Sequence, residues 1–176
     1  MRSLIVHINN LLIPLLPETR FFALKRSLWR MAGAKIGNNV KLSSSLKIYG
    51  SGYLVIGDNT WIGCQTLIAC SSRVEIGCNV DIAPRVYIGT GTHTIDVKAD
   101  HVAATDISKD VVIGNGCWLC ANSMILPGVV LGQKCVVAAG AVVSRTIAGD
   151  KQMLAGVPAR KVKSYNDEEV QTICGL

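Results

Sequence analysis

The sequence predicts an all-β fold in which short strands wind into about five stacked triangular coils. Aliphatic residues recur at every sixth position, and the residue after them is small in 13 of 15 cases. A step of six matches neither the 3.6-residue period of a helix nor the two-residue period of a simple hairpin sheet. The fifteen aliphatic positions are Ile36, Leu42, Ile48, Ile56, Ile62, Ile68, Ile76, Ile82, Ile88, Ile113, Leu119, Ile125, Leu131, Val137 and Val143.

Each step of six residues predicts one short strand and one tight corner, so that three steps close a coil. Stacked coils pair strand on strand about 4.8 Å apart, which makes five coils about 24 Å tall. We expect the fifteen aliphatics to fill the axis and the residue two before each to form a slimmer inward position. The register slips by two residues after Ile48 and after Ile68, and a long insertion follows Ile88. One edge of the column is therefore expected to carry bulges and then a loop.

Three segments follow from this pattern. We expect a helical N-terminal arm or cap over residues 1–35 and the β-helix over residues 36–146, with an inserted loop at 90–112. A C-terminal extension over residues 147–176 is expected to end in a short polar helix that begins at residues 166–169. An open-ended column needs such caps at both ends.

The N-terminal arm has apolar residues at helical spacing, which predicts two helices. The second is expected to begin at Glu18 and to stop at Gly33. A cap or subunit contact is the favoured role, and peripheral membrane contact is the alternative, favoured by nearby arginines and lysines. The apolar residues are Leu4, Ile8, Leu11, Leu12 and Leu15 in the first helix and Phe21, Leu24, Leu28 and Met31 in the second, and the basic residues are Arg2, Arg20, Lys25, Arg26 and Arg30.

Composition excludes several classes of protein. At 49% hydrophobic residues the chain is not disordered. The net charge of +6 indicates an acidic partner. No basic block alternates with aromatics as in a nucleic-acid-binding surface, and a phosphate-bearing cofactor fits the charge equally well. Seven cysteines, an odd number, predict reduced thiols and a cytoplasmic location. The N-terminal apolar stretch lacks a cleavage site and is too short to span a bilayer, so neither export nor a membrane span is expected.

Two cysteines have a spacing that also occurs in metal sites. Cys117 and Cys120 are three residues apart, but a single pair is weak evidence for zinc. Cys117 and Cys135 are 18 residues apart, which is one full coil. We expect these two to stack inside the column as small apolar residues, and we expect no metal site.

The insertion is the longest stretch that breaks the repeat, and it contains His93 and His101. Loops on rigid scaffolds often carry function, and histidine is a general base near neutral pH. Position alone leaves His93 either a catalytic base or a polar loop residue, and gives His101 no role.

Four blocks of sequence, at residues 76–96, 111–132, 136–146 and 155–163, resemble the hexapeptide acyltransferases. They are most similar to the branch of maltose/galactoside and polysaccharide sugar O-acetyltransferases. The resemblance implies a left-handed parallel β-helix, a homotrimer and acetyl-CoA as the acyl donor. It also implies that His93 is the general base in a direct transfer and that backbone N–H groups stabilise the oxyanion.

The resemblance transfers a set of donor contacts to this chain, and the basic residues among them suit phosphates. At the acceptor side the chain departs from the maltose/galactoside branch, since residues 63–65 read Gly-Cys-Gln where that branch is rich in asparagine. We therefore expect an acceptor other than a galactoside or maltose. Residues 17–42 are similar to the lead-in of the capsule and O-antigen members, and this resemblance implies a sugar hydroxyl in surface polysaccharide (capsule, exopolysaccharide or O-antigen) biosynthesis as the acceptor. The donor-contact residues are Ala121, Ala139, Ser144, Arg160 and Lys163, and the weaker acceptor-side candidates are Asp81, Tyr87, Asp96 and Trp118.

Other functions remain open at this stage. The main alternative is N-acetylation of an amino sugar on a nucleotide. Serine O-acetylation is a weaker alternative, because the serine O-acetyltransferases carry a large helical N-terminal domain and only about 35 residues precede the first coil here. A zinc carbonic anhydrase on the same scaffold needs three imidazoles, whereas the third histidine, His7, lies outside the coils. A non-enzymatic scaffold would favour a flat repeated array, such as threonine columns, and none repeats here.

Overall fold

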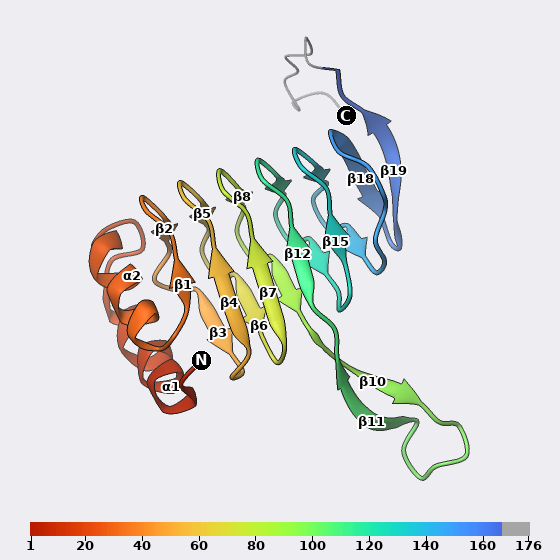
Figure 1. Ribbon diagram of the computed structural model, residues 1–176, viewed down its shortest axis with the longest axis horizontal. Helices are drawn as coiled ribbons and strands as arrows, with labels where there is room; N and C mark the ends of the chain where they lie inside the picture. Colours follow the sequence, from red (N-terminus) through yellow and green to blue (C-terminus); the bar gives the residue numbers. More distant parts are fainter. Residues whose placement is uncertain (167–176) are drawn as a thin grey trace.

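The computed structural model describes residues 1–166, and most of them form a column of parallel strands with two helices across one end (Figure 1). Three sheets run along the column, and each contributes one strand to every coil. The first sheet contains β1 (Lys35–Ile36), β4 (Tyr53–Ile56), β7 (Arg73–Ile76), β12 (Val111–Ile113) and β15 (Val130–Leu131). The third contains β3 (Lys47–Tyr49), β6 (Leu67–Ala69), β9 (Tyr87–Gly89), β14 (Met124–Ile125) and β17 (Val142–Val143).

The second sheet is longer than the other two. It contains β2 (Lys41–Leu42), β5 (Trp61–Ile62), β8 (Asp81–Ile82), β13 (Trp118–Leu119), β16 (Val136–Val137), β18 (Gln152–Gly156) and β19 (Ala159–Ser164). Strand β18 adds a sixth parallel rung, pairing Leu154 with Val137. Strand β19 then turns back antiparallel to β18. The polar helix expected from residue 166 lies, beyond its first residue, outside the described part of the chain.

The core confirms the six-residue pattern. All fifteen aliphatic positions are buried, with at most 6% of any side chain exposed. They pair in register from coil to coil, so that Ile62 and Ile82 are neighbours in the second sheet and Ile82 is followed there by Leu119. The slimmer positions are buried as well, and they are Ala34, Val40, Leu46, Leu54, Thr60, Thr66, Val74, Val80, Val86, Val111, Cys117, Ser123, Val129, Cys135 and Ala141.

Small residues at the corners are required by close backbone contact. At Gly57 a Cβ atom would lie 2.6 Å from the backbone nitrogen of Cys78, and at Gly63 it would lie 2.8 Å from the carbonyl oxygen of Ile82. Any larger residue would push apart the coils that the strands hold together. The predicted excess of small residues after each aliphatic therefore has a steric cause.

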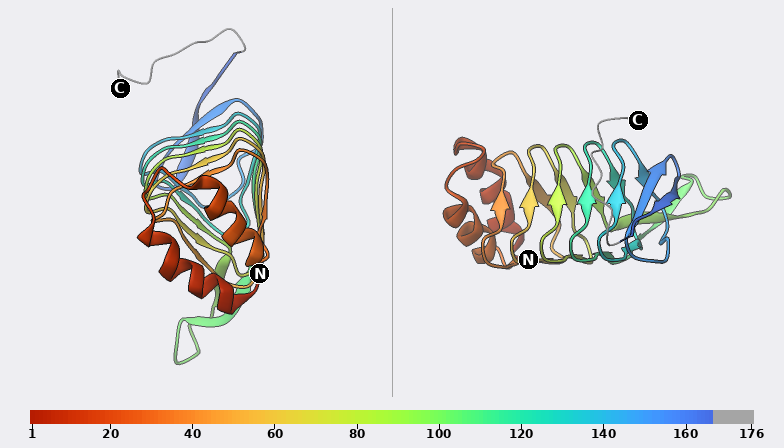
Figure 2. Two further views of the ribbon diagram at one scale, coloured as in Figure 1. Left: turned by 90° about the vertical axis from the view of Figure 1, so that its left-hand side faces the viewer. Right: turned by 90° about the horizontal axis from the view of Figure 1, so that it is seen from above.

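The helices α1 (Ser3–Leu12) and α2 (Phe22–Met31) cover the N-terminal end of the column, as Figure 2 shows from that end. A short 3₁₀ turn, η1 (Ile13–Leu15), follows α1, and α2 begins four residues later than expected. The predicted stop at Gly33, with φ +96°, is confirmed.

The side of the helices that touches the column differs from the apolar face expected from sequence. The buried apolar residues Val6, Ile13 and Trp29 pack against the core of the column, and polar side chains bond its open edge, one to each sheet. Asn10 bonds both backbone groups of Ile48 in β3, at 2.6 Å to the oxygen and 3.2 Å from the nitrogen. Lys25 Nζ donates to the oxygen of Leu42 in β2 at 3.1 Å.

The third contact comes from Arg30, whose guanidinium donates to the oxygen of Ile36 in β1 at 2.6 and 2.9 Å. Exposed edge strands present unpaired backbone groups, which require polar partners. This requirement places Asn10 and Lys25 among the residues that face the column. Burial lowers the pKa of Lys25, and the charge of nearby Glu18 opposes that shift.

The insertion is also more ordered than a loop. It forms an antiparallel hairpin of β10 (Gly91–Ile95) and β11 (Ala103–Ser108), which leaves the column after β9. Strand β12 begins at Val111, inside the range of 90–112 expected for the insertion. The stacking of Ile76 on Ile113 continues across the insertion without a shift.

Candidate active site

The hairpin β10–β11 is fixed to the column at its base. Thr90 is fully buried, and its Oγ1 accepts from the backbone N–H groups of Ser71 at 2.8 Å and Ser72 at 3.2 Å. The same hydroxyl donates to the oxygen of Ala69 at 3.2 Å. These contacts use the bulged corner of the preceding coil, where the sequence slips by two residues. The bulge and the hairpin therefore form one structural unit.

His93 lies on β10 directly opposite Asp106 on β11, and the register shifts just after it, between His93 and Ile95. Its Nδ1 is 2.9 Å from Oδ1 of Asp106. Because an ionised carboxylate only accepts hydrogen bonds, we assign the Nδ1 proton to His93, which leaves Nε2 able to accept a proton. The imidazole is about half exposed, at 53%, and is therefore accessible to a substrate.

Asp106 is the residue that sequence reasoning missed. It is 13 positions from His93, and only the hairpin register, including its irregularity, brings the two together. The sequence has four acidic residues from 96 to 110, at positions 96, 100, 106 and 110, so composition alone does not identify the partner of His93. If the insertion had been predicted to form a hairpin, fewer acidic residues would have been candidates for the partner of His93.

A pocket of about 370 Å³ lies beside this pair. Its polar lining and its position at the junction of hairpin and column suit the binding of a small polar group. The lining residues are Ser71, Gly91, Thr92, His93, Asp106, Ile107 and Ser108.

The four weaker acceptor-side candidates do not line this pocket. Asp81 and Trp118 are neighbours on the second sheet, in β8 and β13, and Tyr87 lies on β9 of the third sheet. Asp96 accepts a hydrogen bond from the backbone of Lys98 at 2.9 Å, and so stabilises the far turn of the hairpin. Within one chain, the structure does not bring these residues to His93. His101 is exposed near the same turn.

The donor-contact candidates fall on two corners of the column. Ala121 and Ala139 stack in adjacent coils at the corner between the second and third sheets, where Gly140 donates to the oxygen of Ala121 at 3.0 Å. Ser144 directly follows β17 of the third sheet. It lies on the same corner of the column as the hairpin, which follows β9, but two coils closer to the C-terminal end.

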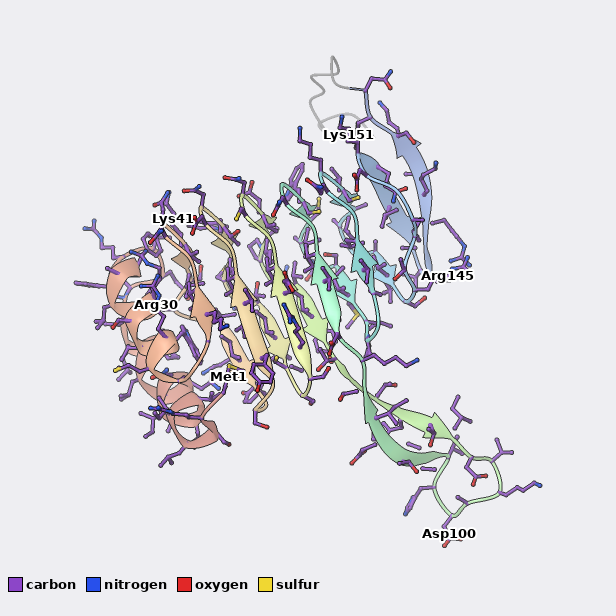
Figure 3. All side chains as sticks on the ribbon, viewed as in Figure 1. Met1, Arg30, Lys41, Asp100, Arg145 and Lys151 are labelled. Atoms are coloured by element: carbon purple, nitrogen blue, oxygen red, sulfur yellow. The ribbon has the colours of Figure 1, made fainter. Side chains whose placement is uncertain are left out.

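The basic candidates lie beyond these coils, on β19. Arg160 pairs with Ala155 of β18 and is exposed. The Nζ atom of Lys163 lies 5.3 Å from the centre of the Tyr165 ring. Figure 3 shows the labelled Arg145 and Lys151 in the same half of the molecule, away from the helices.

Cys117 and Cys135 stack inside the column, which confirms their predicted packing role. Both are buried, and Sγ of Cys117 donates to the oxygen of Gly132 at 3.0 Å. The adjacent Cys135 thiol and burial raise the pKa of Cys117, so this thiol stays protonated. Among residues 1–166, no three His, Cys, Asp or Glu side chains are grouped so that they could hold a metal ion. In the same range, no helix has the length and apolar character needed to cross a bilayer.

Known proteins share both this sequence pattern and this fold. Residues 110–145 match the family described as bacterial transferase hexapeptide (six repeats). The chain is 30% identical over 146 residues to galactoside O-acetyltransferase of Escherichia coli, covering 82% of this chain and 70% of that protein. It is 33% identical over 120 residues to WcaF of E. coli, described as a colanic acid biosynthesis acetyltransferase, covering 68% of this chain and 64% of WcaF.

A solved structure of similar shape is a hexapeptide-repeat-containing acetyltransferase from Vibrio cholerae complexed with acetyl-CoA. The two superpose with a TM-score of 0.73 at 25% identity, covering 94% of this chain and 87% of that one. This chain thus spans slightly less than two thirds of WcaF and nearly the whole of the similar structure.

Proposed function

This chain belongs to the hexapeptide-repeat acetyltransferases, and from that premise we propose that it transfers an acetyl group from acetyl-CoA to a sugar hydroxyl. The observation that carries the proposal is the hydrogen-bonded pair of His93 and Asp106 beside a polar pocket. The similarity to a protein of colanic acid biosynthesis favours surface polysaccharide as the acceptor class.

In the proposed reaction His93 is the general base. Asp106 holds the Nδ1 side of the ring, so Nε2 takes the proton of the acceptor hydroxyl while that oxygen attacks the thioester carbonyl carbon. The carbonyl oxygen becomes negative and is stabilised by backbone N–H groups. The carbon–sulfur bond then breaks, and the imidazolium returns its proton to the departing thiolate. The acetyl group passes directly to the acceptor and is never attached to the protein.

The residues proposed for the donor suit its chemistry. Ala121 and Ala139 have small side chains, so a thin pantetheine arm can lie close to the backbone there. Arg160 and Lys161 are exposed on β19, and a guanidinium binds phosphate oxygens in a bidentate manner. Lys163 and Ser144 complete the proposed contacts.

A homotrimer is part of the proposal. His93 and Ser144 share one corner of the column, whereas Ala121 and Ala139 share another. A donor that touches both groups is best accommodated between two adjacent columns, each of which contributes one corner. Asp81, Tyr87, Asp96 and Trp118 remain acceptor-side candidates in such an assembly. The six described cysteines are free thiols, which favours the reducing cytoplasm as the location.

Replacing the proposed base tests the function. His93→Ala should lower the turnover of acetyl-CoA by about 10²–10⁴-fold, since general-base catalysis contributes about that factor. His101→Ala is the matched control, because it removes an exposed imidazole from the same hairpin and should leave turnover unchanged. Release of free thiol would be followed with sugar, nucleotide-sugar and lipid-linked acceptors. Unchanged turnover in His93→Ala would contradict the proposal, and turnover with nucleotide-linked amino sugars alone would favour N-acetylation.

A further inference from the structure

The N-terminal helices leave a large apolar surface uncovered, which we call the cap surface. It consists of Leu4, Ile8, Leu11, Leu12, Leu15, Phe21, Leu24 and Met31. Among these, Leu4 is 73% exposed and Leu15 is 81% exposed. Isolated exposed apolar residues are common, but a group on two adjacent helices indicates an interaction site.

The cap surface points away from the column. In α1 the residues buried against the column are Val6, Asn9 and Asn10, which lie on the opposite side of the helix from Leu4 and Leu11. Polar contacts at the column leave the apolar side free, because Asn10, Lys25 and Arg30 already satisfy the open sheet edges. Figures 1 and 2 show both helices across the end of the column, well separated from the hairpin.

Positive charge is concentrated at the same end of the chain. Residues 1–57 contain eight of the 18 lysines and arginines but only one of the 12 acidic residues, Glu18. Arg2 and Arg20 are exposed, and neither makes an ion pair with a carboxylate within the described residues. The rest of the chain therefore has no excess of positive charge.

We propose that the cap surface docks on an anionic lipid bilayer, with α1 lying in the plane of the headgroups. Arg2 precedes α1 and Arg20 lies between α1 and α2, and an apolar helix surface flanked by such basic residues binds the interface through buried apolar area and charge together. A second copy of this chain is a poorer occupant, because two cap surfaces would bring together two regions of high positive charge. An acidic protein is the remaining alternative occupant of the cap surface, and the experiment below distinguishes it from a bilayer.

The test is co-sedimentation of the full chain with vesicles. Wild-type protein should bind vesicles of mixed phosphatidylcholine and phosphatidylglycerol more tightly than vesicles of phosphatidylcholine alone, and added salt should weaken the binding. Leu11→Gln combined with Leu15→Gln should weaken binding at least about tenfold. Arg2→Gln combined with Arg20→Gln should weaken it about fivefold per arginine.

Matched substitutions elsewhere serve as controls. Val97→Gln changes a residue that is 79% exposed at the hairpin turn, and Arg145→Gln removes an exposed charge beyond β17, so neither should alter vesicle binding. All of these side chains are exposed, and thermal unfolding would verify that each variant folds.

Four results would overturn the proposal. The first is absence of wild-type binding to anionic vesicles, and the second is equal binding to neutral ones. The third is a fall in oligomer mass in Leu11→Gln/Leu15→Gln without any change in vesicle binding, which would assign the surface to a subunit contact. Binding that requires an added acidic protein would count against the bilayer in the same way.

Discussion

The column and the hairpin β10–β11 are built on opposite principles. In the column, fifteen repeated aliphatic positions are buried and each is paired with its equivalent in the next coil. In the hairpin, most residues of both strands are exposed, and Ile95 is 80% exposed. Folding free energy therefore comes from the column, because buried apolar area is the main stabilising contribution.

The difference separates stability from the proposed chemistry. The hairpin carries His93 and Asp106 but buries little apolar surface, so its residues are not constrained by core packing and suit the proposed reaction. The column contributes no titratable group to the pair, but it fixes the base of the hairpin through Thr90. Substitutions in the two regions should consequently affect different quantities.

The largest effect on stability is expected from the column. Ile82→Ala should lower the free energy of unfolding by about 2–5 kcal/mol, because a fully buried side chain with neighbours in both adjacent coils leaves a cavity. Ile95→Ala in the hairpin is the matched control and should change it by less than about 0.5 kcal/mol. Urea unfolding of both variants measures the contrast. Similar losses in the two would show that the hairpin is part of the core.

A smaller loss of stability is expected at the junction of the two regions. Thr90→Val should cost about 1 kcal/mol, because it leaves the backbone N–H groups of Ser71 and Ser72, in two partly buried hydrogen bonds, without their acceptor. Turnover should fall as well, since the base of the hairpin is no longer fixed. Thr105→Val, at an exposed position on β11, is the control. If Thr90→Val unfolds at the same urea concentration as wild type, the junction does not depend on this hydroxyl.

The smallest effect is expected at Asp106, where a substitution should change the reaction rate but not the stability. Asp106→Asn should reduce kcat about tenfold, a typical scale for losing part of a general-base contribution, while KM for acetyl-CoA and the urea midpoint stay unchanged. Asp106→Glu should recover part of the lost rate, because it restores a carboxylate that can hold Nδ1. Steady-state kinetics with a fixed acceptor measures both. A change in KM with constant kcat would contradict a role in positioning His93.

The column was predictable because its signal is local and repeated. Every coil requires aliphatic residues at the same positions, so Ile36 and Val143 could be assigned to one six-residue pattern from the sequence alone. The cap was only half predictable, since Asn10, Lys25 and Arg30 respond to open sheet edges that exist only after the column has formed.

The candidate site divides in the same way. His93 could be singled out from its motif within the insertion, whereas Asp106 depends on the register of a hairpin with an irregular pairing. Such a register is set by turn geometry and by one shifted pair, neither of which has a periodic signature. The four acceptor-side candidates stay predictions, since other residues of the chain line the pocket beside His93.

One consequence of the sixth rung concerns length. Strand β18 lies three pairings beyond β8, the strand of the coil that carries the hairpin. At about 4.8 Å per pairing, the offset along the axis is about 14 Å. Adding or deleting a coil would alter this offset only by a whole increment, so the separation between the imidazole and the basic strand β19 is quantised. The length of a ligand that reaches from the imidazole to β19 must therefore match an offset set by a whole number of coils.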